Sequence, residues 1–74
     1  MTMDLQKAFD SLNQIKKDYP KDYIFVEIDC CLYEIPMYYV RIYKNQDKIS
    51  SVSENLADAI NRALVTFKEV FKKQ

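Results

Sequence analysis

The sequence contains no histidine and no glycine. Without histidine it lacks the side chain that most often acts as a general base near neutral pH. Without glycine it lacks the flexible loops in which a backbone closely approaches a phosphate group. The sequence therefore offers little of the chemistry on which enzymes depend, and we expect a non-enzymatic protein with no cofactor.

Cysteine is also scarce, and the two that are present, Cys30 and Cys31, are adjacent. Two thiols without histidine are too few for a four-ligand zinc site in one chain. Neighbouring residues of a strand point to opposite faces, which is a poor geometry for a disulfide between them. We expect Cys30 to be a core thiol and Cys31 a surface thiol.

The sequence has neither a net charge nor a long apolar run. Its 11 basic and 11 acidic residues give a formal net charge of zero, so no overall field attracts nucleic acid or an anionic membrane. No apolar run reaches the length of a membrane span, and residues 1–10 lack a signal-peptide pattern. We expect a cytoplasmic protein without a membrane role, with its 74 residues in one domain, 1–74.

Residues 3–19 are predicted to form a first helix. Thr2 or Asp4 can accept hydrogen bonds from the free amides at its start, and Pro20 disfavours helical geometry at Tyr19. Apolar side chains follow the spacing of one helical face, at Leu5, Ala8, Phe9, Leu12, Ile15 and Tyr19.

Residues 23–44 are predicted to form two strands joined by a tight loop. The even-numbered residues 24–32 are apolar or cysteine and indicate a buried face. Pro36 has no amide hydrogen for a central ladder, which predicts a loop at Glu34-Ile35-Pro36. The resulting register pairs Tyr33 with Met37, Cys31 with Tyr39, Asp29 with Arg41, Glu27 with Tyr43, Cys30 with Val40, and Ile28 with Ile42.

A short third strand and a second helix complete the predicted elements. After a polar turn at residues 44–48, residues 49–52 are expected to return as a strand with Ile49 beside Ile42. Ser51 and Glu54 match a helix capping box, and Ser53 is an alternative cap. The helix that follows has a regular apolar stripe, formed by Leu56, Ala59, Ile60, Ala63, Leu64, Phe67, Val70 and Phe71.

This order of elements predicts an α+β fold, α-β-β-(β)-α, with an antiparallel sheet of two or three strands. The helices can cover one face each, which makes three layers, or share one face, which makes two. Glu27, Asp29 and Arg41 lie at the centre of the odd-numbered face and argue against a helix buried on it. We therefore predict a two-layer sandwich with both helices on the even-numbered face.

The odd-numbered face is the candidate binding surface. Its charged centre is surrounded by Tyr23, Phe25, Tyr33, Met37, Tyr39 and Tyr43. Tyrosine and arginine are favoured in protein interfaces, and an open aromatic surface of this extent is unusual for a monomer. Three interpretations are open: a protein partner or second copy, aromatic residues acting only as strand formers, and single-stranded nucleic acid stacked on the rings. We favour the first, with contact at Phe25, Tyr39, Arg41 and Tyr43.

Two groups of charged residues suggest other functions. Glu27 and Asp29 share a strand face and could form a carboxylate pair for acid–base catalysis or a hard metal ion, but ion pairing with Arg41 is the better interpretation. Basic side chains gather at the helix ends, where such groups usually form solvated faces. The basic clusters are Lys16, Lys17 and Lys21 at one end, and Lys68, Lys72 and Lys73 at the other. The cluster of Lys68, Lys72 and Lys73 would hold phosphates if the protein bound nucleic acid.

The order of elements resembles that of the double-stranded RNA-binding domain, with residues 51–65 where that family begins its second helix. That family has a Lys-Lys-x-x-x-Lys run there and a Gly-Pro-x-His loop between its first strands. Here the corresponding segments are 51–58, without lysine, and 34–37, which read Glu-Ile-Pro-Met. The RNA contacts of the family therefore do not carry over.

The last half of the chain resembles small phage and prophage accessory proteins of the helix-sheet-helix sandwich type. The resemblance rests on Ser53, Leu56, Ala59-Ile60 and Ala63-Leu64. It implies a small intracellular protein that binds and modulates a host protein. We expect a non-enzymatic protein that self-associates or docks a protein partner through its aromatic sheet face; the alternative is a nucleic-acid-binding domain with the topology of the double-stranded RNA-binding domain.

Overall fold

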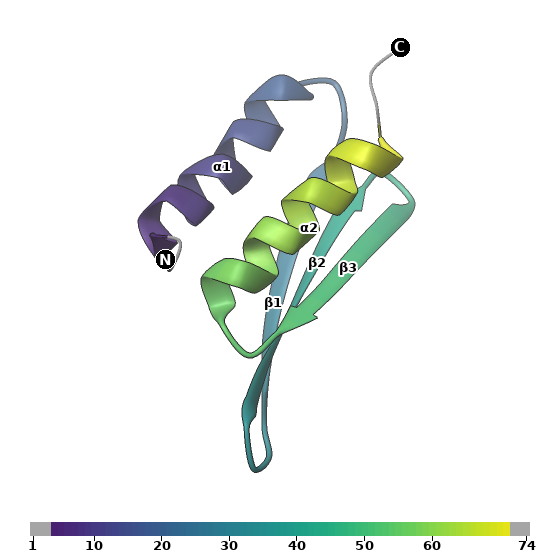
Figure 1. The fold of residues 1–74 in the computed structure, drawn as a ribbon. Coiled ribbons are helices and arrows are strands. Elements are labelled where there is room, and N and C mark those ends of the chain that lie inside the picture. The colour runs from purple at the N-terminus through teal and green to yellow at the C-terminus, as the bar shows by residue number, and fades with distance from the viewer. Residues whose placement is uncertain (1–3, 72–74) are drawn as a thin grey trace.

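The computed structural model describes residues 4–71. A helix is followed by three antiparallel strands and a second helix (Figure 1), so the predicted order is confirmed and the third strand is present. The elements are α1 Leu5–Asp18, β1 Ile24–Leu32, β2 Pro36–Lys44, β3 Asp47–Ser53 and α2 Leu56–Val70. Within residues 4–71, neither helix combines the length and apolar character that crossing a membrane requires.

α1 begins and ends where local chemistry predicts. Asp4 is the N-cap, and its carboxylate accepts a hydrogen bond from the backbone N–H of Gln6 at 3.0 Å. The other predicted cap, Thr2, lies outside the described residues. Tyr19 is the C-cap, because Pro20 disfavours helical geometry at the residue before it.

The register between β1 and β2 differs by two residues from the predicted one. The observed pairs are Phe25 and Tyr43, Glu27 and Arg41, Asp29 and Tyr39, Cys31 and Met37, Val26 and Ile42, and Ile28 and Val40. Pro36 is the first residue of β2, opposite Leu32, and the loop is residues 33–35. A strand end tolerates the missing N–H of proline. Because a slip of two residues keeps every side chain on its face, the apolar alternation does not separate the two registers.

A tight turn, Asn45-Gln46, joins β2 to β3. Asn45 has a φ of 57°, in the left-handed region that asparagine enters more readily than most residues other than glycine. Its side-chain oxygen accepts a hydrogen bond from the N–H of Tyr23 at 3.0 Å, which ties the turn to the start of β1. The predicted pair of Ile42 and Ile49 is present.

α2 begins later than the predicted capping box. Asn55 is the N-cap, and its side-chain oxygen accepts from the N–H of Asp58 at 2.9 Å. Ser53, the predicted alternative cap, instead donates to the Asp58 carboxylate at 2.7 Å. This hydrogen bond lowers the pKa of Asp58. Ser51 lies in β3 and donates its hydroxyl to the carbonyl of Ala59, so the capping-box prediction is wrong because the strand continues through it.

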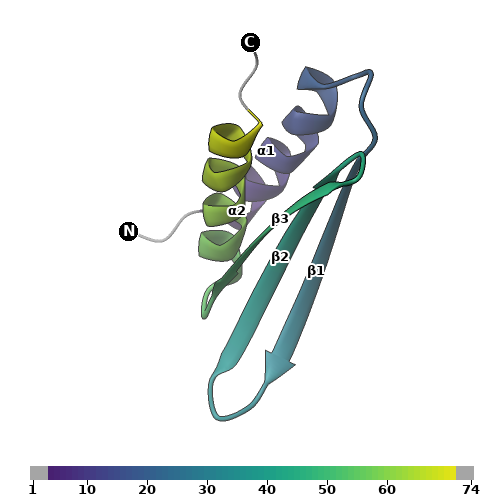
Figure 2. The same ribbon diagram turned by 90° about the vertical axis from the view of Figure 1, so that its right-hand side faces the viewer.

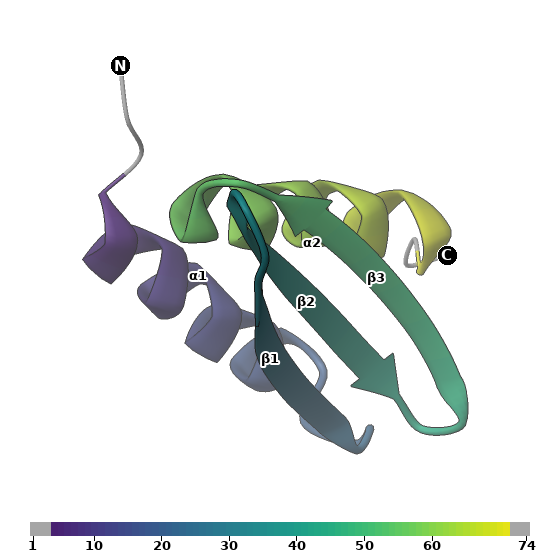
Figure 3. The same ribbon diagram turned by 90° about the horizontal axis from the view of Figure 1, so that it is seen from below.

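Both helices lie on one face of the sheet, as predicted, which makes two layers (Figure 2). The strand order is β1-β2-β3, so β1 and β3 are the sheet edges. α2 packs on β2 and β3, whereas α1 lies beside α2 on the β1 side (Figure 3). The buried core between the layers consists of Ala8, Leu12, Ile15, Val40, Ile42, Ile49, Ala59, Ile60, Ala63, Leu64 and Phe67.

The β1–β2 hairpin projects beyond both helices (Figure 2). β1 and β2 have 9 residues each and span about 30 Å, whereas the 15 residues of α2 span about 22 Å. Residues 28–37, called the arm below, are therefore poorly covered, and Leu32 is 77% exposed. Cys30 is exposed for the same reason, so its prediction as a core thiol is wrong, whereas Cys31 is exposed as expected.

Candidate binding surface

The four predicted contact residues lie together on the sheet face opposite the helices, called the outer face below. Three neighbouring rows cross it from β1 through β2 to β3. The rows are Phe25, Tyr43 and Lys48; Glu27, Arg41 and Ser50; and Asp29, Tyr39 and Val52. The slip of two residues changes the partners within the rows but leaves the composition of the face as predicted.

Arg41 is the centre of the outer face. Its Nη1 donates to Glu27 Oε1 at 3.2 Å and also to Asp29 Oδ2. The hydrogen bond to Asp29 and the charges of both carboxylates raise the pKa of Arg41 above its ordinary value. The guanidinium therefore holds two carboxylates of β1, which leaves this centre with one excess negative charge.

Tyr43 connects the charged centre to the aromatic residues. Its hydroxyl donates to Glu27 Oε1 at 3.1 Å, and its ring lies 5.7 Å from that of Phe25, measured between centroids. Loss of hydration raises the pKa of Tyr43, and the hydrogen bond to Glu27 adds to this effect. Because the hydroxyl and the ring each have a partner, the side chain is fixed in position on the face.

The outer face is only partly exposed, since neighbouring strands shield each other. Phe25 is 46% exposed, and Val52 at the β3 edge is also exposed. Tyr39, Arg41 and Tyr43 on the central strand are half-buried. The result is a surface of fixed rings around a charged centre, which matches the composition of protein interfaces.

The carboxylates of Glu27 and Asp29 share one cationic partner. Both face the same guanidinium, and residues 4–71 contain no cluster of three or more potential metal-ligating side chains. The cross-strand ion pair favoured over a catalytic pair is thus present, with Glu27 rather than Asp29 directly opposite Arg41.

The predicted lysine cluster at the end of α2 is only partly described. Lys68 is exposed in the last turn of the helix, whereas Lys72 and Lys73 lie outside the described residues. Lys68 belongs to the helix layer and the outer face lies across the sheet from it (Figure 2). The structure therefore does not bring Lys68 together with the aromatic rings.

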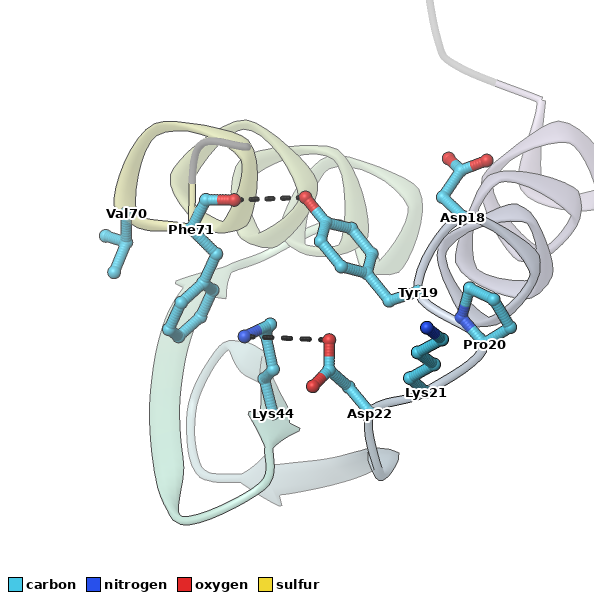
Figure 4. Close-up of a pocket in the computed structure, with 8 residues that line it drawn as sticks. All are labelled: Asp18, Tyr19, Pro20, Lys21, Asp22, Lys44, Val70 and Phe71. Carbon is cyan, nitrogen blue, oxygen red and sulfur yellow. Dashed lines mark hydrogen bonds and ion pairs between the residues drawn. The ribbon is translucent and has the colours of Figure 1, made fainter. Parts of the chain in front are cut away.

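A pocket of about 600 Å³ lies where the end of α1 meets the end of α2 (Figure 4). Its wall includes Tyr19, whose hydroxyl donates to the carbonyl of Phe71 at 3.0 Å. The Lys44 ammonium lies 5.3 Å from the Phe71 ring centroid and 3.7 Å from Asp22 Oδ2. The lysine is thus already paired with a carboxylate and a ring, and these contacts link the end of β2 to the end of α2 and to the segment between α1 and β1.

The sequence prediction missed the exposed edge of β1 and the groove beside it. Val26 and Ile28 were predicted as core residues. Val26 packs against the core cluster, whereas Ile28 is 37% exposed, and both line a groove of about 200 Å³ whose helix side is formed by Phe9, Leu12, Asn13 and Lys16. Strand length could indicate the uncovered end of β1, but the groove depends on where α1 lies beside the strand, which the sequence pattern does not specify.

No protein-family model matches the chain, and comparison with curated proteins and with solved structures gives no significant match.

Proposed function

We propose that this is a non-enzymatic binding protein whose outer face binds a protein, and that this partner is a second copy of the chain. The observation that carries the proposal is the placement of both helices on the opposite face. Phe25, Tyr39, Arg41 and Tyr43 thereby share a surface that no described helix covers. An aromatic surface of this kind is the usual composition of an interface.

The charges of the outer face favour a second copy as the partner. In a two-fold dimer the same patch meets itself, so it must be self-complementary. The centre carries a guanidinium next to two carboxylates, and Arg41 of one copy can therefore approach Glu27 or Asp29 of the other. The surrounding rings would add buried area at low entropic cost.

Two alternatives use the same surface or the lysines. A different protein could bind the outer face, which is the role that the resemblance to phage accessory proteins implies. Nucleic acid is less favoured, because a phosphate backbone on the outer face would meet Glu27 and Asp29, and Arg41 is already paired with both.

The test is light scattering on the purified protein over a range of concentrations, with reducing agent present to prevent disulfides through Cys31. We expect a dimer that dissociates on dilution, and a monomer for Tyr39→Glu, which buries a charge in the interface. The matched control is Val65→Glu. Val65 is 49% exposed on α2, in the other layer, so this variant should remain dimeric.

A wild-type monomer at every concentration, or a Tyr39→Glu dimer, would overturn self-association through the outer face. The nucleic-acid alternative has its own measurement, which is the anisotropy of a labelled single-stranded oligonucleotide. Binding that weakens steeply with salt and is lost on substitution of Lys68, Lys72 and Lys73 would support that alternative instead.

A further inference from the structure

We propose that β1 binds an extended segment of a partner protein as a fourth strand, and that this segment alternates apolar and basic side chains. The surface is the outer edge of β1 together with the groove under α1. It shares only Glu27 and Asp29 with the outer face and requires no second copy, so this inference does not depend on self-association.

The edge of β1 is suited to strand addition. β1 is 9 residues long and lies at the end of the strand order, so among the described residues one side of its backbone pairs with no strand. Exposed edges are usually protected by charged side chains, above all lysine, by proline or by a bulge. β1 has neither lysine nor proline, its two carboxylates pair with Arg41 on β2, and its pairing with β2 is continuous from Ile24 to Leu32. A long regular edge of this kind is the platform on which extended peptides bind.

The two layers leave room for a fourth strand. Helices pack about 8–10 Å apart and strands about 4.8 Å apart, so two helices side by side have the width of about four strands. This sheet has three, and α2 already covers β2 and β3. α1 therefore extends past β1 on the edge side (Figure 3).

Apolar side chains face this space. The groove between α1 and β1 is lined by Val26 and Ile28 from the strand and by Phe9, Leu12, Asn13 and Lys16 from the helix, so its strand side is apolar and its polar groups come from α1 alone. Phe9 remains 37% exposed although it belongs to the apolar stripe of α1. A strand added next to β1 would place every second side chain against these groups, which selects apolar residues at those positions.

The opposite side of the added strand would meet negative charge. Glu27 and Asp29 lie on the outer side of β1, and Arg41 is the one basic side chain of the described residues that forms ion pairs with them. Cross-strand neighbours of opposite charge stabilise a sheet, whereas like charges destabilise it. Lysine or arginine at the alternate positions of the partner segment would balance the excess carboxylate.

These charges disfavour a second β1 as the added strand in the register that pairs Ile28 with itself. In an antiparallel pair centred on Ile28, Glu27 of each copy would lie opposite Asp29 of the other, which is unfavourable. The other edge, β3, is less suitable for an apolar segment. Its groove with α2 includes polar side chains on both elements, among them Ser51, Asn61 and Thr66.

The test uses two synthetic peptides of about seven residues, which is the length of a typical strand. Both have blocked ends; one alternates valine with lysine, and the other alternates valine with glutamate. Titration into the ¹⁵N-labelled protein should shift the amide signals of β1 and of the α1 turn around Phe9. We expect the glutamate peptide to bind about tenfold more weakly, because its charges face Glu27 and Asp29.

Two protein variants locate the site. Ile28→Lys and Phe9→Lys place a charge in the groove and should abolish binding of the lysine peptide. Val65 lies on α2 next to β3, at the other edge of the sheet, so Val65→Lys should bind the peptide as the wild type does. Phe9→Lys leaves the outer face intact and should self-associate normally, which separates failure of this inference from failure of the proposed function. Equal affinity for both peptides, no shift at β1, or binding by both groove variants would overturn the inference.

Discussion

Among single residues, Tyr43 links the aromatic and charged parts of the outer face. Loss of hydration disfavours the charged phenolate, and the neutral phenol donates a hydrogen bond to Glu27. Both effects favour the neutral form, so the folded protein holds the pKa of Tyr43 above the ordinary value of 10.0.

The raised pKa of Tyr43 predicts a dependence of stability on alkaline pH. The group stabilises the fold fully below the ordinary tyrosine pKa, and this contribution is lost as the pH rises through the higher value of the folded state. We expect absorbance titration to show one tyrosine ionising late, and Tyr43→Phe to remove that step. Urea unfolding above pH 10 should then show a shallower loss of stability in Tyr43→Phe than in the wild type. Identical profiles would contradict the prediction.

At the scale of elements, the turn between β2 and β3 depends on Asn45. Alanine there would have to keep the left-handed φ of 57°, and it would lose the side-chain hydrogen bond with Tyr23. We expect Asn45→Ala to lower the free energy of unfolding by on the order of 1–2 kcal/mol. Asn45→Gly keeps the conformation and loses only the side-chain bonds, so its loss should be smaller. Chemical denaturation of both variants measures the difference, and an equal loss would show that φ does not matter.

The elements themselves were largely predictable, because amphipathic periods of helix and strand determine which residues face the core. The register between β1 and β2 was not predictable. Arg41 reaches both Glu27 and Asp29, so a cross-strand charge match is satisfied in either register. Pro36 excluded a central position but not the first position of a strand. At α2, serine and asparagine are equivalent caps, and only the length of β3 decides in favour of Asn55.

For the whole molecule, the core is built around Phe67. The ring is fully buried, and its centroid lies 5.5 Å from that of Tyr19 and 4.9 Å from that of Phe71. We expect Phe67→Ala to cost about 3–5 kcal/mol, from lost burial and the cavity left behind. In a domain of this size such a loss approaches the total stability.

The control for this prediction lies on the same helix. Val65 is exposed, so Val65→Ala should change the unfolding free energy by less than about 1 kcal/mol. Thermal and urea unfolding of the two variants give the comparison. A comparable loss in both would contradict the prediction, because alanine favours the helix at either position and only core packing should separate the two variants.

The two-layer arrangement could be predicted because charged residues at the centre of one face exclude a helix from it. How far the two helices cover the sheet could not be predicted. Cys30 has the parity of a core residue, yet it is exposed, and it belongs to the hairpin that projects beyond the helices (Figure 2). The groove beside Ile28 likewise depends on the lateral position of α1, which periodicity within each segment does not specify.

The projecting arm and the rest of the domain differ in how easily they unfold. Its inner side lacks the helix cover that Val40 and Ile42 have, and its loop begins at Tyr33, which is 88% exposed. Opening residues 28–37 would break hairpin pairing but would leave the buried core cluster intact. The arm can therefore fray and re-form while the body stays folded, as a low-energy local unfolding unit attached to a more stable one. A hydrophobic hairpin that opens independently is also the part of the chain most accessible to another molecule before the rest unfolds.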